Sequence, residues 1–387
     1  MSKHLVFIGA GHAHLTALAN MTRFTGEGHN VTVISASPYH YYSGMGPGML
    51  AGIYNPRETR FNVKRLTESG GGQFINDTVI SIDPTKRAIH LRGGNTVEYD
   101  VLSLNTGSEI ATGAIDASFD TVFKVKPIEN LFTARCNLIA ALEKGPVQIA
   151  VIGGGPAGTE IANTAWRIAT EMKANAQITL VSEGKILHRF PAKARKLAMK
   201  HMIAKGISVL ENTPVKGNTR DTLRLENGRE IPFDVAFVAT GTKPTNLFKN
   251  SGFSVDKDGG LPVNEYLQSQ QFPEIFGGGD CIGFVPRPLD KVGVFPVRQN
   301  PILLENLYAA LSDGKIPLRP FVPQRVYLLI LNMGDGTGIF VRKPFIFRGK
   351  IAFNIKDRID RKFMNRFQRS GELHEPVDCR SWGKTAG

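Results

Sequence analysis

The chain has 387 residues, 42% of them hydrophobic and 21% charged, which is typical of a folded protein with two or three domains and excludes a disordered one. Its net charge of +13 is consistent with an anionic partner. The three cysteines, Cys136, Cys281 and Cys379, are far apart and form no C-x-x-C pair, so we expect no disulfide framework and no metal site. We see no cleavable apolar leader, and no apolar run reaches the roughly 18 residues that span a bilayer.

The chain opens with an apolar strand, residues 5–8, which leads into the turn Gly9-Ala-Gly-His-Ala-His14. In a dinucleotide-binding turn the first glycine permits the bend and the second lets the backbone approach a pyrophosphate. The third allows the next helix to pack against the strand. Gly9 and Gly11 take the first two places, but His14 takes the third, where a bulky residue should push the helix away or reshape the turn. We favour phosphate binding; the alternative is that His14 is an ordinary packing or surface residue.

A second apolar strand, residues 30–35, ends at Ser35. Dinucleotide sites usually carry an acid here to bond the ribose hydroxyls, and a serine bonds them more weakly. After residues 39–50 and a mixed region, the strand of residues 99–104 leads into Asn105-Thr106-Gly107.

The same pattern returns further along the chain. A strand leads into Gly153-Gly-Gly155-Pro-Ala-Gly158, which has all three glycines, and a helix that contains Glu160 follows. The next strand ends at Glu183, whose carboxylate would favour the free 2′-hydroxyl of NADH over NADPH, although an exposed strand-end charge explains it nearly as well. This copy closes with Thr240-Gly241, as the first closes with Thr106-Gly107. The repeat predicts an α/β protein with two doubly wound dinucleotide domains.

The last third of the chain differs from both copies. It contains Gly277-Gly-Gly-Asp280, a stretch with helical spacing over residues 297–311, and strand-like alternation beyond residue 325. A basic, amphipathic segment follows at residues 355–369.

Taken in order, these motifs resemble the pyridine-nucleotide-dependent FAD oxidoreductases, and among them the type II NADH dehydrogenases and sulfide:quinone reductases. A closer likeness is to the FAD domain sometimes fused ahead of selenophosphate synthetase. That likeness is carried by Gly9-Ala-Gly-His-Ala-His14, Tyr42-Ser-Gly-Met-Gly-Pro-Gly48, Val297-Arg-Gln-Asn-Pro301 and the basic segment of residues 356–364. The resemblance implies a split FAD domain at residues 1–115 and 243–325, an NAD(P)H domain at 116–242 and a membrane-facing unit at 326–387.

The resemblance also assigns site residues. In it, Asp280 lies near the ribityl chain or the pyrophosphate, Gly46 and Pro47 form an edge against the flavin, and the helix near residue 297 points its N-terminus at the flavin. The residues expected to bind FAD are Gly9, Gly11, His12, His14, Ser35, Tyr42, Gly46, Pro47, Thr106, Gly107, Asp280 and Gln299. The residues expected to bind NADH or NADPH are Gly153, Gly155, Gly158, Glu160, Glu183 and Gly241. A quinone is expected near Gln299 and Pro301.

The basic segment concentrates the positive charge. Residues 342–369 hold ten lysines and arginines but two acids. Wound as a helix, the segment places Ile355, Ile359, Phe363 and Phe367 on one face, with bases beside and opposite them. Such a helix suits the surface of an anionic membrane without spanning it. The alternative is a helix packed on the body or on a second subunit, and a homodimer is left open. We expect no nucleic-acid role, because no recognition module or basic face with stacking aromatics is present.

We therefore predict a cytoplasmic enzyme at the inner face of a membrane that transfers a hydride from NAD(P)H to FAD and then two electrons to a quinone. No side chain need act as a covalent catalyst. The first alternative is chalcogen oxidation of the sulfide:quinone type, against which the absence of an evident cysteine pair counts. The second is a flavin- and nucleotide-binding adaptor without rapid turnover.

Overall fold

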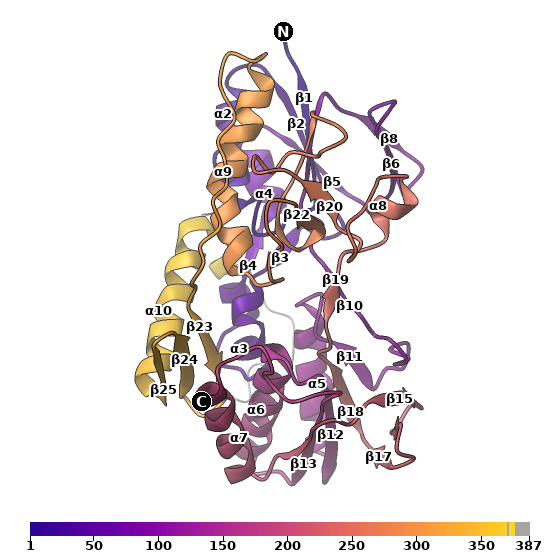
Figure 1. Ribbon diagram of the computed structural model, residues 1–387, viewed down its shortest axis with the longest axis vertical. Coiled ribbons are helices and arrows are strands. Elements are labelled where there is room, and N and C mark those ends of the chain that lie inside the picture. Colours follow the sequence, from indigo (N-terminus) through magenta and orange to yellow (C-terminus); the bar gives the residue numbers. More distant parts are fainter. Residues whose placement is uncertain (370, 376–387) are drawn as a thin grey trace.

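The computed structural model describes residues 1–369 and 371–375 of the chain. Two domains of the same construction lie one above the other, each built on a five-stranded parallel sheet (Figure 1). The first sheet has the strand order β21 (Ile275–Gly277), β9 (Val101–Leu104), β1 (His4–Ile8), β2 (Asn30–Ser35), β5 (Gln73–Asn76). The second has the order β11 (Val122–Lys124), β18 (Val235–Val238), β12 (Val147–Ile152), β13 (Ala176–Val181), β14 (Ser208–Leu210). The predicted fold class of two doubly wound domains is confirmed.

The central strands are apolar because both faces of each sheet are covered. β9 and β18 are buried at every residue, and β1 and β12 at all but one. The helices that flank the sheets are α1 (Leu15–Ala19), α2 (Thr22–Thr25), α4 (Val63–Ser69) and α9 (Val294–Leu311) in the first domain, and α5 (Asn130–Leu142), α6 (Pro156–Glu171) and α7 (Ala192–Ala204) in the second. Each domain therefore has a hydrophobic core of its own.

The internal repeat extends past the nucleotide turns. Each domain carries a three-stranded antiparallel sheet just before its closing strand. The strands are β6 (Val79–Asp83), β7 (Ala88–Leu91) and β8 (Thr96–Glu98) in the first domain, and β15 (Val215–Asn218), β16 (Thr222–Leu225) and β17 (Glu230–Pro232) in the second. The chain passes between the domains through β10 (Glu109–Ile110) and β19 (Thr242–Lys243), which pair antiparallel. β21 and α9 then return to complete the first domain.

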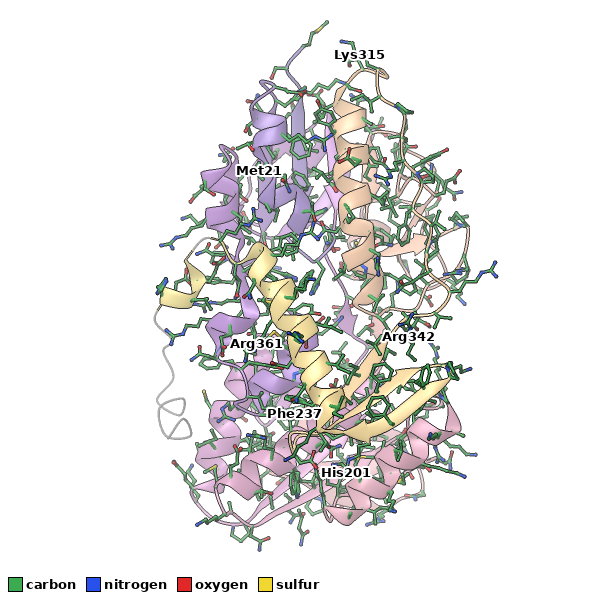
Figure 2. The ribbon with its side chains drawn as sticks, turned by 90° about the vertical axis from the view of Figure 1, so that its left-hand side faces the viewer. Met21, His201, Phe237, Lys315, Arg342 and Arg361 are labelled. Atoms are coloured by element: carbon green, nitrogen blue, oxygen red, sulfur yellow. The ribbon has the colours of Figure 1, made fainter. Side chains whose placement is uncertain are left out.

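The C-terminal unit consists of an antiparallel sheet, β23 (Leu329–Asn332), β24 (Gly338–Arg342) and β25 (Phe345–Gly349), followed by α10 (Lys350–Phe367). Figure 2 shows α10 and this sheet side by side on one flank of the molecule, next to both domains. β23 packs on α6 and β24 on α7 of the second domain, while α10 also reaches α1 and β4 (Arg60–Asn62) of the first.

The apolar face of α10 was predicted to meet a membrane, and for its C-terminal half this is wrong. Phe367 is 2% exposed and packs against Phe61. Phe363 is half-buried and packs against Tyr42 with ring centroids 4.8 Å apart. Ile359 remains 48% exposed. The segment is helical as predicted, but two of the four residues of the predicted membrane face, Phe363 and Phe367, cover the first domain.

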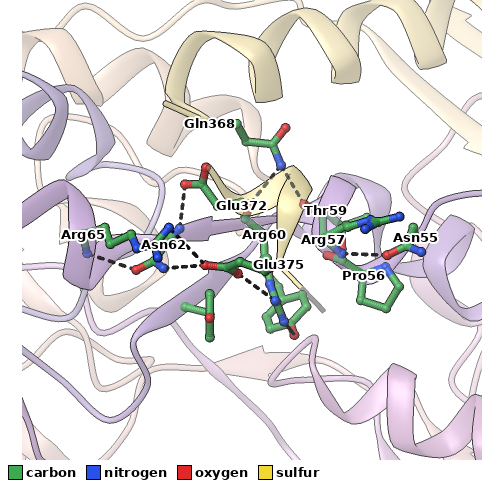
Figure 3. Close-up of polar contacts among 12 residues, drawn as sticks. Asn55, Pro56, Arg57, Thr59, Arg60, Asn62, Arg65, Gln368, Glu372 and Glu375 are labelled. Carbon is green, nitrogen blue, oxygen red and sulfur yellow. Dashed lines mark hydrogen bonds and ion pairs between the residues drawn. The ribbon is translucent and has the colours of Figure 1, made fainter. Parts of the chain in front are cut away.

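The segment after α10 is fixed to the first domain by polar contacts (Figure 3). Glu372 is 1% exposed and accepts a hydrogen bond from the backbone N of Asn62 at 2.9 Å. Glu375 accepts from Asn62 Nδ2 and from Arg60 Nη2, both at 2.8 Å. Gln368 Nε2 donates to the carbonyls of Arg57 and Arg60. These contacts anchor α10 at its C-terminal end, beside the strands that lead into the site described below.

Candidate functional site

One cavity of about 2850 Å³ lies between the two domains and the C-terminal unit. Both glycine turns, the ends of β2 and β13, and the Thr-Gly segments after β9 and β18 contribute to its walls. Pockets for a single ligand usually measure about 300–1,000 Å³. The cavity therefore has room for two dinucleotides at the carboxyl ends of the two sheets, where such folds bind them.

The second glycine turn fills all three expected roles. Gly153 has a φ of +120° and its N donates to Val181 O at 2.8 Å. A Cβ on Gly155 would meet nothing within 4 Å, so this backbone faces open space. A Cβ on Gly158 would collide with Gly153 O, so a glycine is needed for α6 to pack against the turn. Since α6 has 16 residues, its N-terminus offers a full helix dipole to a phosphate.

The first turn has a different construction after its second glycine. His14 is fully buried: its Nδ1 lies 2.6 Å from Gly9 O and its Nε2 2.8 Å from Ser103 Oγ. Burial lowers the pKa of His14 to about 4, so the ring is neutral at pH 7. The prediction that His14 contacts FAD is wrong, because both ring nitrogens are engaged and no part of the side chain reaches the cavity. As the alternative interpretation held, it is a packing residue, and α1 after it has only five residues.

The wall around the first turn fits a flavin dinucleotide. The cavity is lined here by Gly9, Gly11, Thr106 and Gly107, which are predicted to bind FAD, and the buried Thr106 Oγ1 has no hydrogen-bond partner among the described residues. An unpaired buried hydroxyl costs free energy that a bound ligand can recover. Asp280 is also on this wall.

Asp280 is held in place by a cation. Its Oδ2 accepts hydrogen bonds from Lys126 Nζ at 2.9 Å and Ser108 Oγ at 2.8 Å. Burial alone would raise the pKa of Asp280, but the Lys126 ammonium and the Ser108 hydroxyl together hold it below its ordinary value. The carboxylate is therefore charged, and it is suitably placed to accept hydrogen bonds from ligand hydroxyls.

The residues predicted at the quinone site lie elsewhere. Gln299 is 1% exposed, and its Oε1 accepts from the backbone N of Gly279 at 2.7 Å. Asn300 Oδ1 accepts from the backbone N of Thr16 at 2.7 Å. Pro301 is on the exposed face of α9 and does not line the cavity. Gln299 and Asn300 therefore fasten α9 to the turn after β21 and to α1. Neither Gln299 nor Pro301 lines the cavity, so the prediction of a quinone contact there is wrong.

Other predicted residues divide into two groups. The cavity is lined by Tyr42, Pro47, Gly241 and the strand-end residues Ser35 and Glu183. Gly46 does not: it is buried, and a Cβ there would lie 3.1 Å from Ile128 Cγ2 of the second domain. Its small size lets the segment pack on that domain, so the prediction of a flavin contact at Gly46 is wrong. α9 begins at Val294, and its first residues line the cavity.

His12 also lines the cavity, in a histidine pair that the sequence did not suggest. Its Nδ1 lies 3.2 Å from Nε2 of His40, which follows β2 on β3 (Tyr39–Tyr41). Burial, and then the nearby Lys126 ammonium, lowers the pKa of His12 to about 3. Both rings are therefore neutral in the structure as it stands.

A cluster of ionisable groups under α10 was also missed. Lys356 Nζ donates to Asp360 Oδ2 and to Gly44 O, both at 2.6 Å. Tyr42 Oη donates to Asp360 Oδ1 at 3.1 Å. Glu160, which is predicted to bind NADH or NADPH, lines the cavity. It accepts a hydrogen bond from the backbone N of Asn332 on β23 at 2.7 Å, and it faces this cluster. The i,i+4 spacing of Lys356 and Asp360 was the only signal in the sequence, because the groups come from α6, α10 and the loop before η1 (Ser43–Met45).

The pKa values in this cluster are displaced by burial and mutual charge. Burial raises the pKa of Glu160 to about 7, against the lowering effect of the Lys356 ammonium. Burial also raises the pKa of Asp360, although Lys356 opposes it. Burial alone would lower the pKa of Lys356, but the carboxylates of Asp360 and Glu160 raise it above its ordinary value. The cluster can therefore hold and release a proton near neutral pH.

The described cysteines lie away from the cavity. Cys281 is fully buried, its Sγ is 3.4 Å from Gly278 O, and burial raises the pKa of its thiol. Cys136 is on α5, and neither residue lines the cavity. Cys379 lies outside the described residues. No thiol of the described part of the chain is placed to react at this site.

Two dinucleotide domains that face one cavity, with a buried proton-holding cluster beside them, define an oxidoreductase of the two-dinucleotide class. Residues 3–303 match the family described as pyridine nucleotide-disulphide oxidoreductase. The chain belongs to this family, and the predicted resemblance to the superfamily is confirmed.

Curated relatives and solved structures agree with this assignment. A probable NADH dehydrogenase of Dictyostelium discoideum is 23% identical over 380 residues, covering 91% of this chain and 83% of the relative. A type II NADH:quinone oxidoreductase of Staphylococcus saprophyticus is 24% identical over 386 residues, covering 92% of this chain and 94% of the relative. Sulfide:quinone oxidoreductase from Aquifex aeolicus superposes with a TM-score of 0.77 at 19% identity, covering 95% of this chain and 92% of the other. NDH2 from Plasmodium falciparum in complex with NADH superposes with a TM-score of 0.76 at 14% identity, covering 96% of this chain and 98% of the other.

Proposed function

We propose that this chain is a FAD-dependent NAD(P)H:quinone oxidoreductase. The observation that carries the proposal is that one cavity is lined both by the two glycine turns and by apolar residues of the C-terminal unit; we call this last part of the lining the apolar branch. When bound, FAD supplies the ability to accept a hydride from a nicotinamide and to pass two electrons to a second substrate. Relatives named NADH dehydrogenase and NADH:quinone oxidoreductase, which align over most of this chain, support the choice.

The apolar branch is the proposed quinone site. Its walls come from two elements of the C-terminal unit, Leu329 and Leu331 on β23, and Ile359 and Phe363 on α10. A quinone is a flat apolar molecule with two carbonyl oxygens, and this part of the cavity offers apolar side chains together with the polar Lys356 and Asp360. It replaces the site that the sequence suggested at α9.

The buried cluster provides the protons. In the overall reaction NAD(P)H, one proton and a quinone give NAD(P)⁺ and a quinol, so the quinone oxygens must gain two protons along with two electrons. Glu160 is protonated in a substantial fraction near pH 7, and the Lys356 ammonium lies between Gly44 and Asp360. We assign to Glu160 and Lys356 the holding of protons for the quinone oxygens, and to Asp360 and Tyr42 the positioning of Lys356.

The proposed membrane surface is the outer side of the C-terminal unit. Phe345 and Phe347 alternate on β25 and are 69% and 37% exposed, and Ile351 in the first turn of α10 is 68% exposed. The exposed bases Lys343 and Lys350 flank this stretch in the chain, and Arg358 is exposed two turns further along α10. No helix of residues 1–369 or 371–375 is long and apolar enough to cross a bilayer. An apolar patch rimmed by bases suits peripheral attachment to an anionic leaflet, next to the branch that would take up the quinone.

The chemistry is tested by anaerobic stopped-flow reduction of the flavin-loaded protein with NADH and with NADPH, followed by a short-chain quinone. We expect bleaching by a nucleotide and reoxidation by the quinone. Bleaching by sulfide but by neither nucleotide would contradict the proposal and favour the chalcogen alternative. Very slow bleaching by every donor would favour the adaptor.

The membrane surface is tested by cosedimentation with vesicles that contain anionic lipid. Replacing Phe345, Phe347 and Ile351 by serine should release the protein from the vesicles. V322S is the matched control, because Val322 is apolar and 82% exposed but precedes the C-terminal sheet. Equal binding of the triple variant and wild type would refute this surface.

A further inference from the structure

The two glycine turns can be compared position by position, because they are built alike up to the second glycine. The N of Gly9 and the N of Gly153 each donate to the last residues of the next strand at 2.8 Å. A Cβ on Gly9 would collide with Asn105 O, and a Cβ on Gly153 would collide with Ala239 O. Asn105 and Ala239 therefore hold the same place in the two domains, directly after β9 and β18.

The two turns differ at the second glycine, which is Gly11 in the first domain and Gly155 in the second. At Gly155 the direction of a Cβ leads into the cavity and meets nothing within 4 Å. At Gly11 the same direction leads to the side-chain amide of Asn105, with Oδ1 at 2.6 Å and Nδ2 at 2.8 Å from the Cβ position. The amide of Asn105 therefore stands on the ligand side of the first turn, in a place that alanine leaves empty in the second domain.

The strand order explains why Asn105 reaches this place. β9 lies between β1 and β21, so the residue that follows β9 lies between the turns that follow the other two strands. Accordingly, a Cβ on Gly279, in the turn after β21, would also lie close to Asn105, 2.7 Å from Oδ1. These are the two turns that surround the proposed flavin pyrophosphate.

The amide of Asn105 has an unused donor. The side chain is 4% exposed, lines the cavity, and its Nδ2 has no hydrogen-bond partner among the described residues. A buried N–H without a partner is rare in native proteins, and a ligand oxygen within reach of this Nδ2 would supply one. The first turn also needs an added donor more than the second turn does. The helix after the first turn has five residues and the helix after the second has 16, so the first offers a weaker dipole to a phosphate.

We propose that the side-chain amide of Asn105 donates a hydrogen bond to the pyrophosphate of FAD, and that it replaces part of the phosphate binding that a long helix provides in the second domain. This inference rests on the proposed binding of FAD in the first domain. Asn105 is then a cofactor-binding residue outside the glycine motif.

The test is the affinity of the apoprotein for FAD, measured by quenching of flavin fluorescence, together with the thermal unfolding of the apoprotein. N105A copies the residue that the second domain carries at this place, and N105D keeps the size but removes the donor and adds a negative charge. We expect N105A to raise the Kd for FAD roughly 10-fold to 100-fold, the range for a hydrogen bond to a charged group, and N105D to raise it further. N105S, small but still a donor, should bind better than N105A.

The unfolding temperature of the apoprotein separates a ligand contact from a packing role. N137A is the matched control, because Asn137 is exposed on α5 and does not line the cavity. A Kd for N105A within twofold of wild type would overturn the inference. Tight binding of FAD by N105D would also overturn it, because it would show that the side chain at this position accepts a hydrogen bond and does not donate one. A lower unfolding temperature of apo N105A with an unchanged Kd would assign the residue to packing alone. If wild type itself fails to bind FAD, the proposed function fails instead.

Discussion

The two nucleotide turns of this chain come from one pattern but reach phosphate-binding geometry in different ways. In the second domain, Gly158 brings the 16-residue helix α6 against the turn, so the backbone and the helix dipole face the ligand. In the first, His14 takes the place of that glycine and bonds to Gly9 and Ser103 inside the domain. The helix after it is short, and side chains approach the ligand side of the turn instead. If Asn105 binds the FAD pyrophosphate as proposed, similar sheets support one phosphate site built from backbone and another built from side chains.

The largest effect is expected at the third glycine of the second turn, Gly158. G158A would place a methyl group where Gly153 O already lies, which should push α6 away from the turn. We expect a loss of stability of about 3 kcal/mol or more and no measurable reduction by NADH, although FAD should still bind. Circular dichroism melts and flavin content would check this. Normal NADH kinetics in G158A would show that the helix does not need close contact.

At the same position in the first domain, H14A should act on stability rather than on chemistry. It removes two buried hydrogen bonds and the edge-on contact with Phe7, for a loss of about 3 kcal/mol at pH 7.5. Denaturant unfolding would measure it.

The loss in H14A should shrink at pH 5. The folded-state pKa of His14 is about 4, below the ordinary value of 6.5, so the unfolded chain binds more protons between these values. This part of the stability of wild type is therefore present above about pH 6.5 and falls as the pH drops towards 4. A loss that is independent of pH would contradict the buried, neutral state of His14.

The two domains also differ two residues after the third position of the motif, which is His14 in the first turn and Gly158 in the second. Glu160 on α6 corresponds to Thr16 on α1, and Glu160 has a pKa of about 7. We expect the rate of quinone reduction in wild type to fall as the pH rises through 7, because the protonated carboxyl is lost. In E160Q the rate should be about tenfold lower at pH 6 and flat across this range. An unchanged pH profile would exclude Glu160 as the proton holder.

The smallest effect is expected at Ser35 and Glu183, the strand-end residues of β2 and β13. E183S gives the second domain the residue of the first, and it removes the carboxylate proposed to bond the free ribose hydroxyl of NADH. We expect kcat/KM for NADH to fall about 5- to 10-fold, with little change for NADPH, measured by steady-state assay. The exposed Glu226, which also lines the cavity, offers E226S as a control.

Much of the site could be read from the sequence where function lies in the backbone. The glycines at 9, 11, 153, 155 and 158 and the strand-end residues line or shape the cavity, because a strand, a turn and a helix are local structures with local signals. Gln299, Pro301 and Gly46 were misplaced. Each lies on an element that does border the site, but which of its residues face the cavity depends on how that element packs.

The sequence by itself therefore determined the class of the fold, its internal repeat and the two nucleotide turns, since periodicity and glycine spacing follow from local geometry. Only the tertiary structure decided which face of α10 is covered, and that Glu160, Lys356 and Asp360 meet under it. It also placed the amide of Asn105 between two turns that are far apart in the chain. These contacts join segments up to hundreds of residues apart, and burial and charge shift a pKa only once such segments have come together.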